Sequence, residues 1–129
     1  MIKVIITILA VMVTVFILLY LFPPIKVEGD SMYPTFKEGE ILIGCRLFNR
    51  KKCKIGKIYV IHLRNEENGE PYYIIKRLER RVLDIYSADP CYKYFFLGDN
   101  REVSADSRIY GLFESSKVVA VIIGKKGRR

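Results

Sequence analysis

The sequence predicts a small all-β domain carried on one N-terminal transmembrane helix. The chain has 129 residues, and its one long uncharged apolar run covers residues 5–22, IITILAVMVTVFILLYLF. After this run, short segments rich in β-branched and aromatic residues alternate with turn-forming Gly, Asn, Asp and Pro. We therefore expect a membrane anchor over residues 1–24 and a small antiparallel, barrel-like β-sheet domain over residues 25–129.

The apolar run has the length that a helix needs to cross a bilayer core. Tyr20 suits a lipid–water boundary, and the pair Pro23-Pro24 ends a helix. A cleavable signal peptide is the first alternative, but LYLFPPIKVEG holds no Ala-x-Ala-like cleavage site. A buried core helix is the second, but about 105 remaining residues are too few to surround a helix that is apolar on every face.

The net charge of +8 is concentrated in three blocks, Arg46 to Lys57, Arg77 to Arg81 and Lys125 to Arg129. A solvated basic surface is the simplest interpretation. Because the chain has no recognisable nucleic-acid motif, we expect a lipid bilayer with anionic headgroups as the partner rather than nucleic acid. Charge alone does not orient the anchor, since Lys3 on one side is matched by Lys26 on the other.

Cys45, Cys53 and Cys91 lack the C-x-x-C spacing of a zinc site or of a thioredoxin-like redox pair. Cys45 and Cys53 flank a short basic segment and can clip a loop in an oxidising compartment, or all three can be free thiols. We expect no metal and no cofactor. The sequence leaves the redox state and the oligomeric state open.

Six short runs have the composition of strands. A loop or hairpin tip is expected at NEENGEP, residues 65–71, and a short helical turn around Glu114–Lys117. The basic tail after Val118–Gly124 is expected to fray. The expected strands are Ile41–Gly44, Ile58–Leu63, Tyr72–Leu78, Arg81–Tyr86, Lys93–Gly98 and Val118–Gly124.

Ser31 lies in the turn-forming segment GDSMYPT, a few residues after the apolar run. If Ser31 is a nucleophile, it needs a base within hydrogen-bond reach. His62 is the only histidine, but its context IYVIHL favours an ordinary strand position. Strand alternation places Lys76 on one face with Ile74 and Leu78, where partial burial lowers the pKa of its amine. A lysine that extends along an edge strand into water is the alternative.

The segment GDNREVSADSR, Gly98 to Arg108, is too polar for a strand. Its mixture of Asp and Arg predicts a loop held by charge-assisted hydrogen bonds. Such a loop needs no function, although loops carried on rigid strands are also where sites are built.

Together these segments resemble one family, signal peptidase I, the membrane-bound Ser/Lys proteases that remove signal peptides. S-M-x-P-T is present as Ser31 to Thr35, a Lys-Arg pair ends a strand as Lys76-Arg77, and G-D-N-R-x-x-S-x-D-S-R-x-x-G is complete from Gly98 to Gly111. The serine motif alone is weak, because self-cleaving repressors share it. The last motif is specific, and all three occur in the family's order.

The resemblance implies a role for each matching residue. Ser31 is the expected nucleophile, Lys76 the general base, and Ser104 the residue that hydrogen-bonds and orients Lys76. Asp106 and Arg108 are expected to form an ion pair that supports the loop, and Asp99 and Asn100 to hold the motif together. Shallow apolar subsites are expected to bind the small substrate side chains at positions −1 and −3. The residues expected to line them are Val27, Met32, Phe36, Ile74 and Ile75.

The chain departs from the family in several places, and two of them bear on the site or on the size of the domain. Gly29 stands where some members carry a serine that helps to bind the oxyanion, and loss of such a donor costs about 2.7–4 kcal/mol where nothing replaces it. The interval between Lys76 and Gly98 is too short for the large accessory β-domain of some members. The resemblance therefore implies a minimal signal peptidase in the cell membrane, with its catalytic domain on the extracytoplasmic side.

Three other functions compete with removal of signal peptides from exported preproteins. One is a dedicated protease for a single pilin or conjugation protein, which would have the same site residues. Another is a non-enzymatic, membrane-tethered module that binds anionic lipid. A self-cleaving repressor is disfavoured by the transmembrane run and by the absence of a DNA-binding segment.

Overall fold

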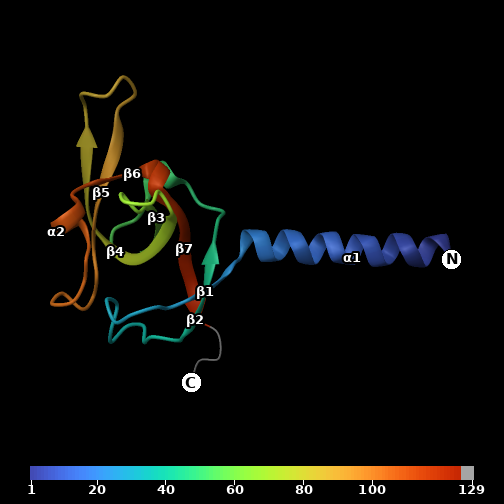
Figure 1. The fold of residues 1–129 in the computed structure, drawn as a ribbon. Helices are drawn as coiled ribbons and strands as arrows, with labels where there is room; N and C mark the ends of the chain where they lie inside the picture. Colours follow the sequence, from blue (N-terminus) through green and yellow to red (C-terminus); the bar gives the residue numbers. More distant parts are fainter. Residues whose placement is uncertain (126–129) are drawn as a thin grey trace.

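The computed structural model describes residues 1–125 and consists of one long helix and a β-domain (Figure 1). Helix α1 spans Ile2–Leu21 and carries no buried residue. It is long and apolar enough to cross a membrane. The tail that the sequence predicts to fray lies, from residue 126 on, outside the described residues.

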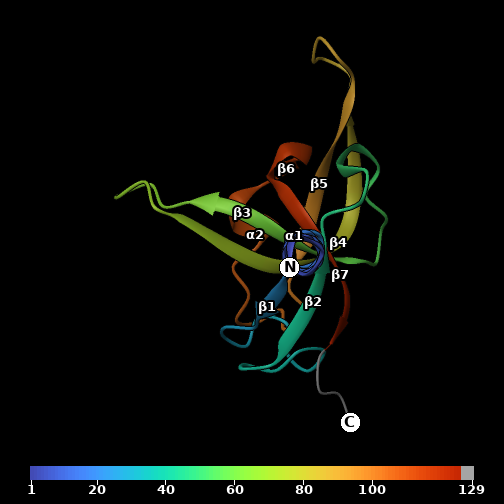
Figure 2. The same ribbon diagram turned by 90° about the vertical axis from the view of Figure 1, so that its right-hand side faces the viewer.

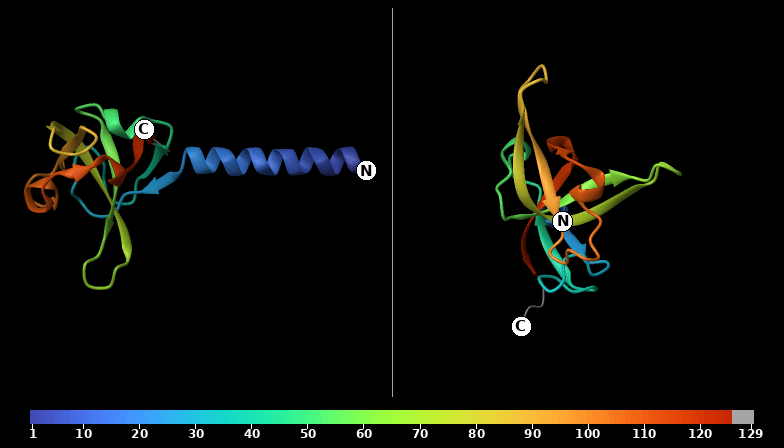
Figure 3. Two further views of the ribbon diagram at one scale, coloured as in Figure 1. Left: turned by 90° about the horizontal axis from the view of Figure 1, so that it is seen from above. Right: turned by 90° about the vertical axis from the view of Figure 1, so that its left-hand side faces the viewer.

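The β-domain is one seven-stranded sheet with the strand order β1-β2-β7-β3-β4-β5-β6, and every pairing is antiparallel. This confirms the prediction of an all-β fold with one N-terminal helix. Strongly twisted hairpins spread away from the point where α1 joins the domain (Figures 2 and 3). The strands are β1 (Pro24–Lys26), β2 (Ile41–Cys45), β3 (Ile58–Arg64), β4 (Pro71–Asp84), β5 (Cys91–Leu97), β6 (Phe113–Glu114) and β7 (Val118–Lys125).

Short helices complete the described chain. They are the 3-10 turn η1 (Arg50–Lys52), helix α2 (Ser107–Tyr110) and the 3-10 turn η2 (Ser115–Lys117). The turn η2 confirms the helical turn expected there. Helix α2 was not predicted, because four residues are too few to show a helical period.

The runs expected as two strands, residues 72–78 and 81–86, fall in the single strand β4, except that residues 85 and 86 lie beyond its end. An irregularity between Leu78 and Arg80 shifts the register of its pairing with β5. The charged residues beyond it stay in the strand because Arg80 lies over the ring of Phe95, with 4.4 Å from the guanidinium carbon to the ring centre. Such stacking lets arginine occupy an exposed strand face. Strands β1 and β6 are too short for the sequence pattern to show.

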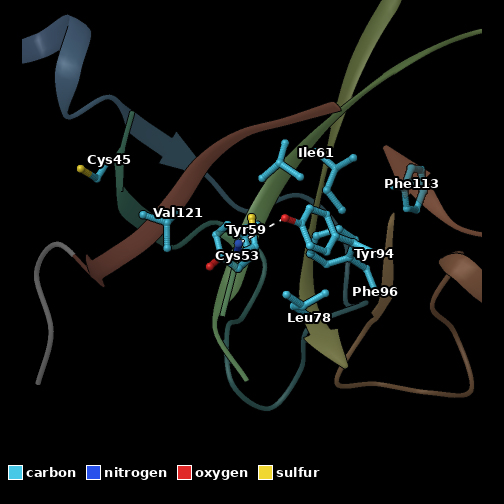
Figure 4. Packing of buried hydrophobic residues seen from close by; sticks show 10 residues of the cluster. Cys45, Cys53, Tyr59, Ile61, Leu78, Tyr94, Phe96, Phe113 and Val121 are labelled. Carbon is cyan, nitrogen blue, oxygen red and sulfur yellow. Dashed lines mark hydrogen bonds between the residues drawn. The ribbon is translucent and has the colours of Figure 1, made fainter. Parts of the chain in front are cut away.

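The core lies between the curved strands and is rich in aromatic side chains (Figure 4). Tyr94 and Phe96 are fully buried and pack edge to face, with ring centres 6.0 Å apart. Burial raises the pKa of Tyr94 to about 12. Its hydroxyl donates to the Arg50 carbonyl at 2.6 Å and accepts from the Cys53 N–H at 3.2 Å. A core tyrosine thus fixes the loop that carries η1.

The end of α1 is fastened to β2 by two backbone hydrogen bonds. The Gly44 N–H donates to the Pro23 carbonyl at 3.0 Å, and the Arg46 N–H donates to the Leu21 carbonyl at 2.9 Å. A side chain at position 44 would meet Ile25 at 2.7 Å, so glycine permits this close approach. The β-domain therefore starts directly at the end of the anchor.

The three cysteines are free thiols in this structure. Cys45 and Cys53 lie well apart in Figure 4. The Cys45 thiol donates to the Leu47 carbonyl at 3.6 Å, and the Cys53 thiol donates to the Arg50 carbonyl at 3.4 Å. Both thus support the loop between β2 and β3 from within.

Candidate active site

Ser31 lies in a turn that leaves β1 and returns to β2. The turn is closed at its base, where the Val27 N–H donates to the Glu40 carbonyl at 2.9 Å. Gly29 has φ of 75°, a conformation that favours glycine over residues with a side chain. Met32, only 1% exposed, anchors the turn to the domain by burying its side chain. Its neighbour Ser31 is half-buried.

Lys76, on β4, reaches the serine. Its Nζ donates to Ser31 Oγ at 2.7 Å. Lys76 is only 3% exposed, which excludes the alternative of a lysine extending into water. In the part of the chain that the structure describes, no carboxylate forms an ion pair with this amine.

Burial lowers the pKa of Lys76, because desolvation disfavours its charged form. The negative charge of Asp106 acts in the opposite direction and offsets only part of this effect. The pair thus combines a hydroxyl with an amine that gives up its proton more easily than a lysine in water.

The loop after β5 holds the serine turn from the other side. The Asn100 N–H donates to the Ser31 carbonyl at 2.9 Å, and the Asn100 side-chain amide donates to the Asp30 carbonyl at 3.0 Å. The Asp99 N–H donates to the sulfur of Met32 at 3.4 Å. These contacts join residues some 70 positions apart in the chain.

Asp99 connects the serine turn to β4, the strand that carries Lys76. Its carboxylate accepts two hydrogen bonds from the Arg77 guanidinium, at 2.8 and 2.7 Å, and one from the Thr35 hydroxyl. The Arg77 guanidinium holds the pKa of Asp99 below its usual range. Because Arg77 follows Lys76 on β4, this two-point contact fixes the strand relative to the turn.

A second carboxylate, this one fully buried, organises the same loop. Asp106 is fully buried and forms an ion pair with Arg108, with 3.0 Å between Nε and Oδ1. It also accepts from the Gly98 N–H at 2.9 Å. Burial by itself would raise the pKa of Asp106, but the hydrogen bonds from Arg108 and Gly98 outweigh it and hold the pKa well below the usual range.

A serine held by a buried amine on an all-β domain, directly after an apolar helix, agrees with a family-level match over most of the chain. The sequence model of the family described as "Signal peptidase, peptidase S26" matches residues 1–79 and 87–124. This chain belongs to that peptidase family.

Individual relatives agree with this assignment. The peptidase is 28% identical to Signal peptidase IB of Staphylococcus aureus (strain N315), over 80% of this chain and 76% of the relative. It is 30% identical to Signal peptidase I of Bacillus amyloliquefaciens, over 87% of this chain and 77% of the relative. Membership of the family makes the chain a protease.

Ser104, expected to orient Lys76, is buried in the peptidase, 8% exposed. Its hydroxyl has no partner at the distance and angle of a hydrogen bond among the described residues, although it lies close enough to Asp106 to contribute to the lowered pKa of that carboxyl. The amine of Lys76 donates to Ser31 instead. The proposed contact between Ser104 and Lys76 therefore stays a prediction.

A cavity of about 610 Å³ opens beside Ser31 and Lys76. Four of the five residues expected to contact substrate line it, namely Val27, Met32, Ile74 and Ile75. Phe36 is not among its lining residues. Tyr72 and Tyr73, which were not predicted, extend the lining along β4, and Arg46 lies at the end near the anchor.

His62 pairs with Tyr73 rather than with Ser31, and its ring lies 5.2 Å from that of Tyr73 across the β3–β4 pair. Among residues 1–125, no group of three or more His, Cys, Asp or Glu side chains has the arrangement of a metal site.

Several residues inside the quoted motifs have no role predicted from the sequence, and the structure places Arg77, Thr35 and Gly98 in contact with the site. Thr35 ends the serine motif and binds Asp99. Gly98 opens the loop motif, and a side chain there would collide with Ser104 and lie 2.6 Å from the Ser31 carbonyl oxygen. Their motif positions were the available signal, but only the structure shows these contacts.

Gly98→Ala is expected to lower the free energy of unfolding by about 2 kcal/mol or more, because the added methyl group displaces both Ser104 and the Ser31 backbone. Denaturant unfolding of the full chain in detergent measures this. Gly124→Ala is the matched control, since a methyl group there meets nothing within 4 Å. Equal stability of the two variants would contradict the packing described here.

Lys76→Met is expected to stabilise the peptidase in a pH-dependent way. The unfolded lysine binds its proton up to about pH 10.4, whereas burial lowers the pKa in the folded state. Between the two pKa values the unfolded chain binds more protons, so the stability of the wild type falls as the pH falls. The advantage of Lys76→Met in melting temperature should grow as the pH drops through this window and then level off. An advantage that is constant from alkaline to neutral pH would contradict the lowered pKa.

Proposed function

We propose that this chain is a membrane-bound serine endopeptidase that removes signal peptides from exported preproteins, with Ser31 as nucleophile and Lys76 as general base. The 2.7 Å contact between the Lys76 amine and the Ser31 hydroxyl carries the proposal. Family membership supports removal of signal peptides by a protease. The dyad and its roles are our inference from the geometry.

The chemistry begins with Lys76 in its neutral form. The lone pair on Nζ accepts the Ser31 proton while Oγ attacks the carbonyl carbon of the scissile bond. The Lys76 ammonium then gives this proton to the leaving amine, and an acyl-enzyme remains. Water, with Lys76 again as base, hydrolyses the ester and frees Ser31. No metal or cofactor takes part in these steps.

The backbone N–H of Ser31 is the proposed donor to the oxyanion, since it makes no hydrogen bond to a described residue. Gly29 offers no side-chain hydroxyl for this purpose, so backbone groups carry the stabilisation. The left-handed turn at Gly29 and the bond from Asn100 to the Ser31 carbonyl hold this N–H in place before substrate arrives.

Two unpaired strand edges support binding of an extended substrate. Within residues 1–125, β1 pairs only with β2, and β4 pairs with β5 only from Arg77 on, so residues 71–76 pair only with β3. Residues 23–28 and 72–76 are also two of the segments that line the cavity. We propose that the substrate adds a strand between these edges, with small residues at −1 and −3 against Val27, Met32, Ile74 and Ile75.

The apolar helix α1 supports attachment to the cell membrane. We propose that the catalytic domain lies on the extracytoplasmic side, where signal peptides emerge. Since the turn of Ser31 follows the end of α1 by only ten residues, from Leu21 to Ser31, cleavage would occur close to the bilayer surface.

The first test is cleavage of a preprotein-like peptide whose signal ends in Ala-x-Ala, by the full chain in detergent. Cleavage after the second Ala is expected for the wild type and is expected to be lost in Ser31→Ala and Lys76→Ala. Ser104→Ala should be impaired less completely. No cleavage by a wild type that circular dichroism shows to be folded would favour a dedicated substrate or the lipid-binding module.

The rate of cleavage is expected to rise with pH through the lowered pKa of Lys76, because only the neutral amine accepts a proton. Lys76→Arg should be inactive at every pH, since a guanidinium stays protonated. A pH–rate profile of kcat that stays flat from mildly acidic to alkaline conditions would exclude Lys76 as the base, as would near-normal turnover by Lys76→Arg.

A further inference from the structure

Residues 46–57, which we name the basic loop, connect β2 to β3 and take no part in the dyad. The loop carries six cationic side chains and no acidic one, and all six residues are exposed. They are Arg46, Arg50, Lys51, Lys52, Lys54 and Lys57. Because the loop contains no acidic residue, its positive charges must be neutralised by groups outside it.

The chain itself neutralises little of this charge. Among residues 1–125, one ion pair reaches the basic loop, from Lys51 Nζ to Asp89 at 3.5 Å, and both side chains are well exposed. An exposed pair of this kind contributes little. Arg50, Lys52, Lys54 and Lys57 form no ion pair with a described residue.

The basic loop is also held in one conformation. Besides the two hydrogen bonds to the Tyr94 hydroxyl, the Lys54 N–H donates to the hydroxyl of the buried Tyr59 at 2.9 Å. Asn49 caps η1 by accepting from the Lys51 N–H at 3.0 Å. Cys53, 1% exposed, anchors the middle of the loop in the core. The charges are thus presented on a fixed backbone, which reduces the entropy lost on binding.

The start of the basic loop lies at the end of the anchor. Besides the hydrogen bond between Arg46 and Leu21, the Arg46 guanidinium lies over the ring of Tyr20, 4.9 Å from its centre. The next residue, Leu47, is 62% exposed. Figures 1 and 2 show the segment that follows β2 on the side of the domain from which α1 leaves. Where α1 crosses a bilayer, Arg46 and Leu47 lie at its surface.

We propose that the basic loop binds the anionic headgroups of the bilayer that α1 spans, with Leu47 inserted among them. Exposed cations beside a transmembrane helix are attracted to an anionic surface over roughly a Debye length. Because the loop begins at the end of α1, the bilayer is the anionic surface nearest to its charges. Arg46 also lines the cavity beside Ser31. Contact of this residue with lipid therefore fixes the orientation of the cavity relative to the membrane.

The proposal rests on insertion of α1 and not on the chemistry of Ser31, so its test uses the full chain carrying Ser31→Ala. The chain has no tryptophan, which makes one introduced Trp a unique fluorescent reporter. Leu47→Trp reports on the basic loop. Val103→Trp is the matched control, because Val103 is also 62% exposed and its loop lies on the far side of the domain from α1 (Figure 1).

The two proteins are reconstituted into nanodiscs of phosphatidylcholine, with or without phosphatidylglycerol, that contain a chain-brominated phosphatidylcholine as quencher. Leu47→Trp is expected to shift to the blue and to be quenched more strongly when phosphatidylglycerol is present. The effect should weaken when NaCl rises from about 0.1 M to about 1 M, which shortens the Debye length from about 10 to about 3 Å. Val103→Trp should not respond.

Arg50→Gln combined with Lys52→Gln is then added to Leu47→Trp. Removing two charges near the surface is expected to lower the ratio of the lipid-bound to the lipid-free state of the basic loop by roughly tenfold or more. Lys37→Gln combined with Arg64→Gln is the control of equal charge, and it should leave the quenching unchanged. An emission of Leu47→Trp that is the same in both lipids, an equal response of Val103→Trp, or an equal effect of the two double variants would overturn the proposal.

Discussion

Burial of the Lys76 amine beside Ser31 is the constraint on which the rest of the site depends. An amine only 3% exposed loses most of the hydration that favours its charged form, and no carboxylate among the described residues replaces that hydration with an ion pair. A buried amine of this kind needs rigid, well-packed surroundings that keep water away from it. The sheet supplies it, because Leu78 on the same face of β4 is fully buried in the core.

Two carboxylates, the fully buried Asp106 and the half-buried Asp99, lie near Ser31 and Lys76 while the pKa of the Lys76 amine stays lowered. Asp99 is satisfied by Arg77 and Thr35, and Asp106 by Arg108 and the Gly98 N–H. Each carboxylate is therefore neutralised and hydrogen-bonded by its own partners, and each holds segments of the backbone together. Asp106 still attracts a proton to Lys76, but this attraction is weaker than the desolvation that opposes it. The result is a site held by ion pairs that do not include Lys76.

The cavity is closely connected to the membrane anchor. Arg46 belongs at once to the end of the anchor, to the start of the basic loop and to the lining of the cavity. Hydrogen bonds from β2 to Leu21 and Pro23 leave almost no linker between helix and sheet. A cavity placed this way has little freedom to turn relative to a bilayer that α1 spans. Contact between the basic loop and lipid would remove much of the freedom that remains.

The sequence by itself determined the apolar helix, the all-β class and the candidate residues Ser31, Lys76 and Asp106. The helix and the fold class follow from local pattern, namely an uncharged run and short β-rich segments, whereas the three candidate residues follow from motifs that match those of a known family. It did not determine that residues 71–84 form one strand, because stacking of Arg80 on Phe95 keeps charged residues in the sheet. Nor did it show that Thr35 and Gly98 are part of the site. Those facts arise only where β5, the serine turn and β4 meet, since contacts between residues far apart in the chain leave no periodic trace in its order.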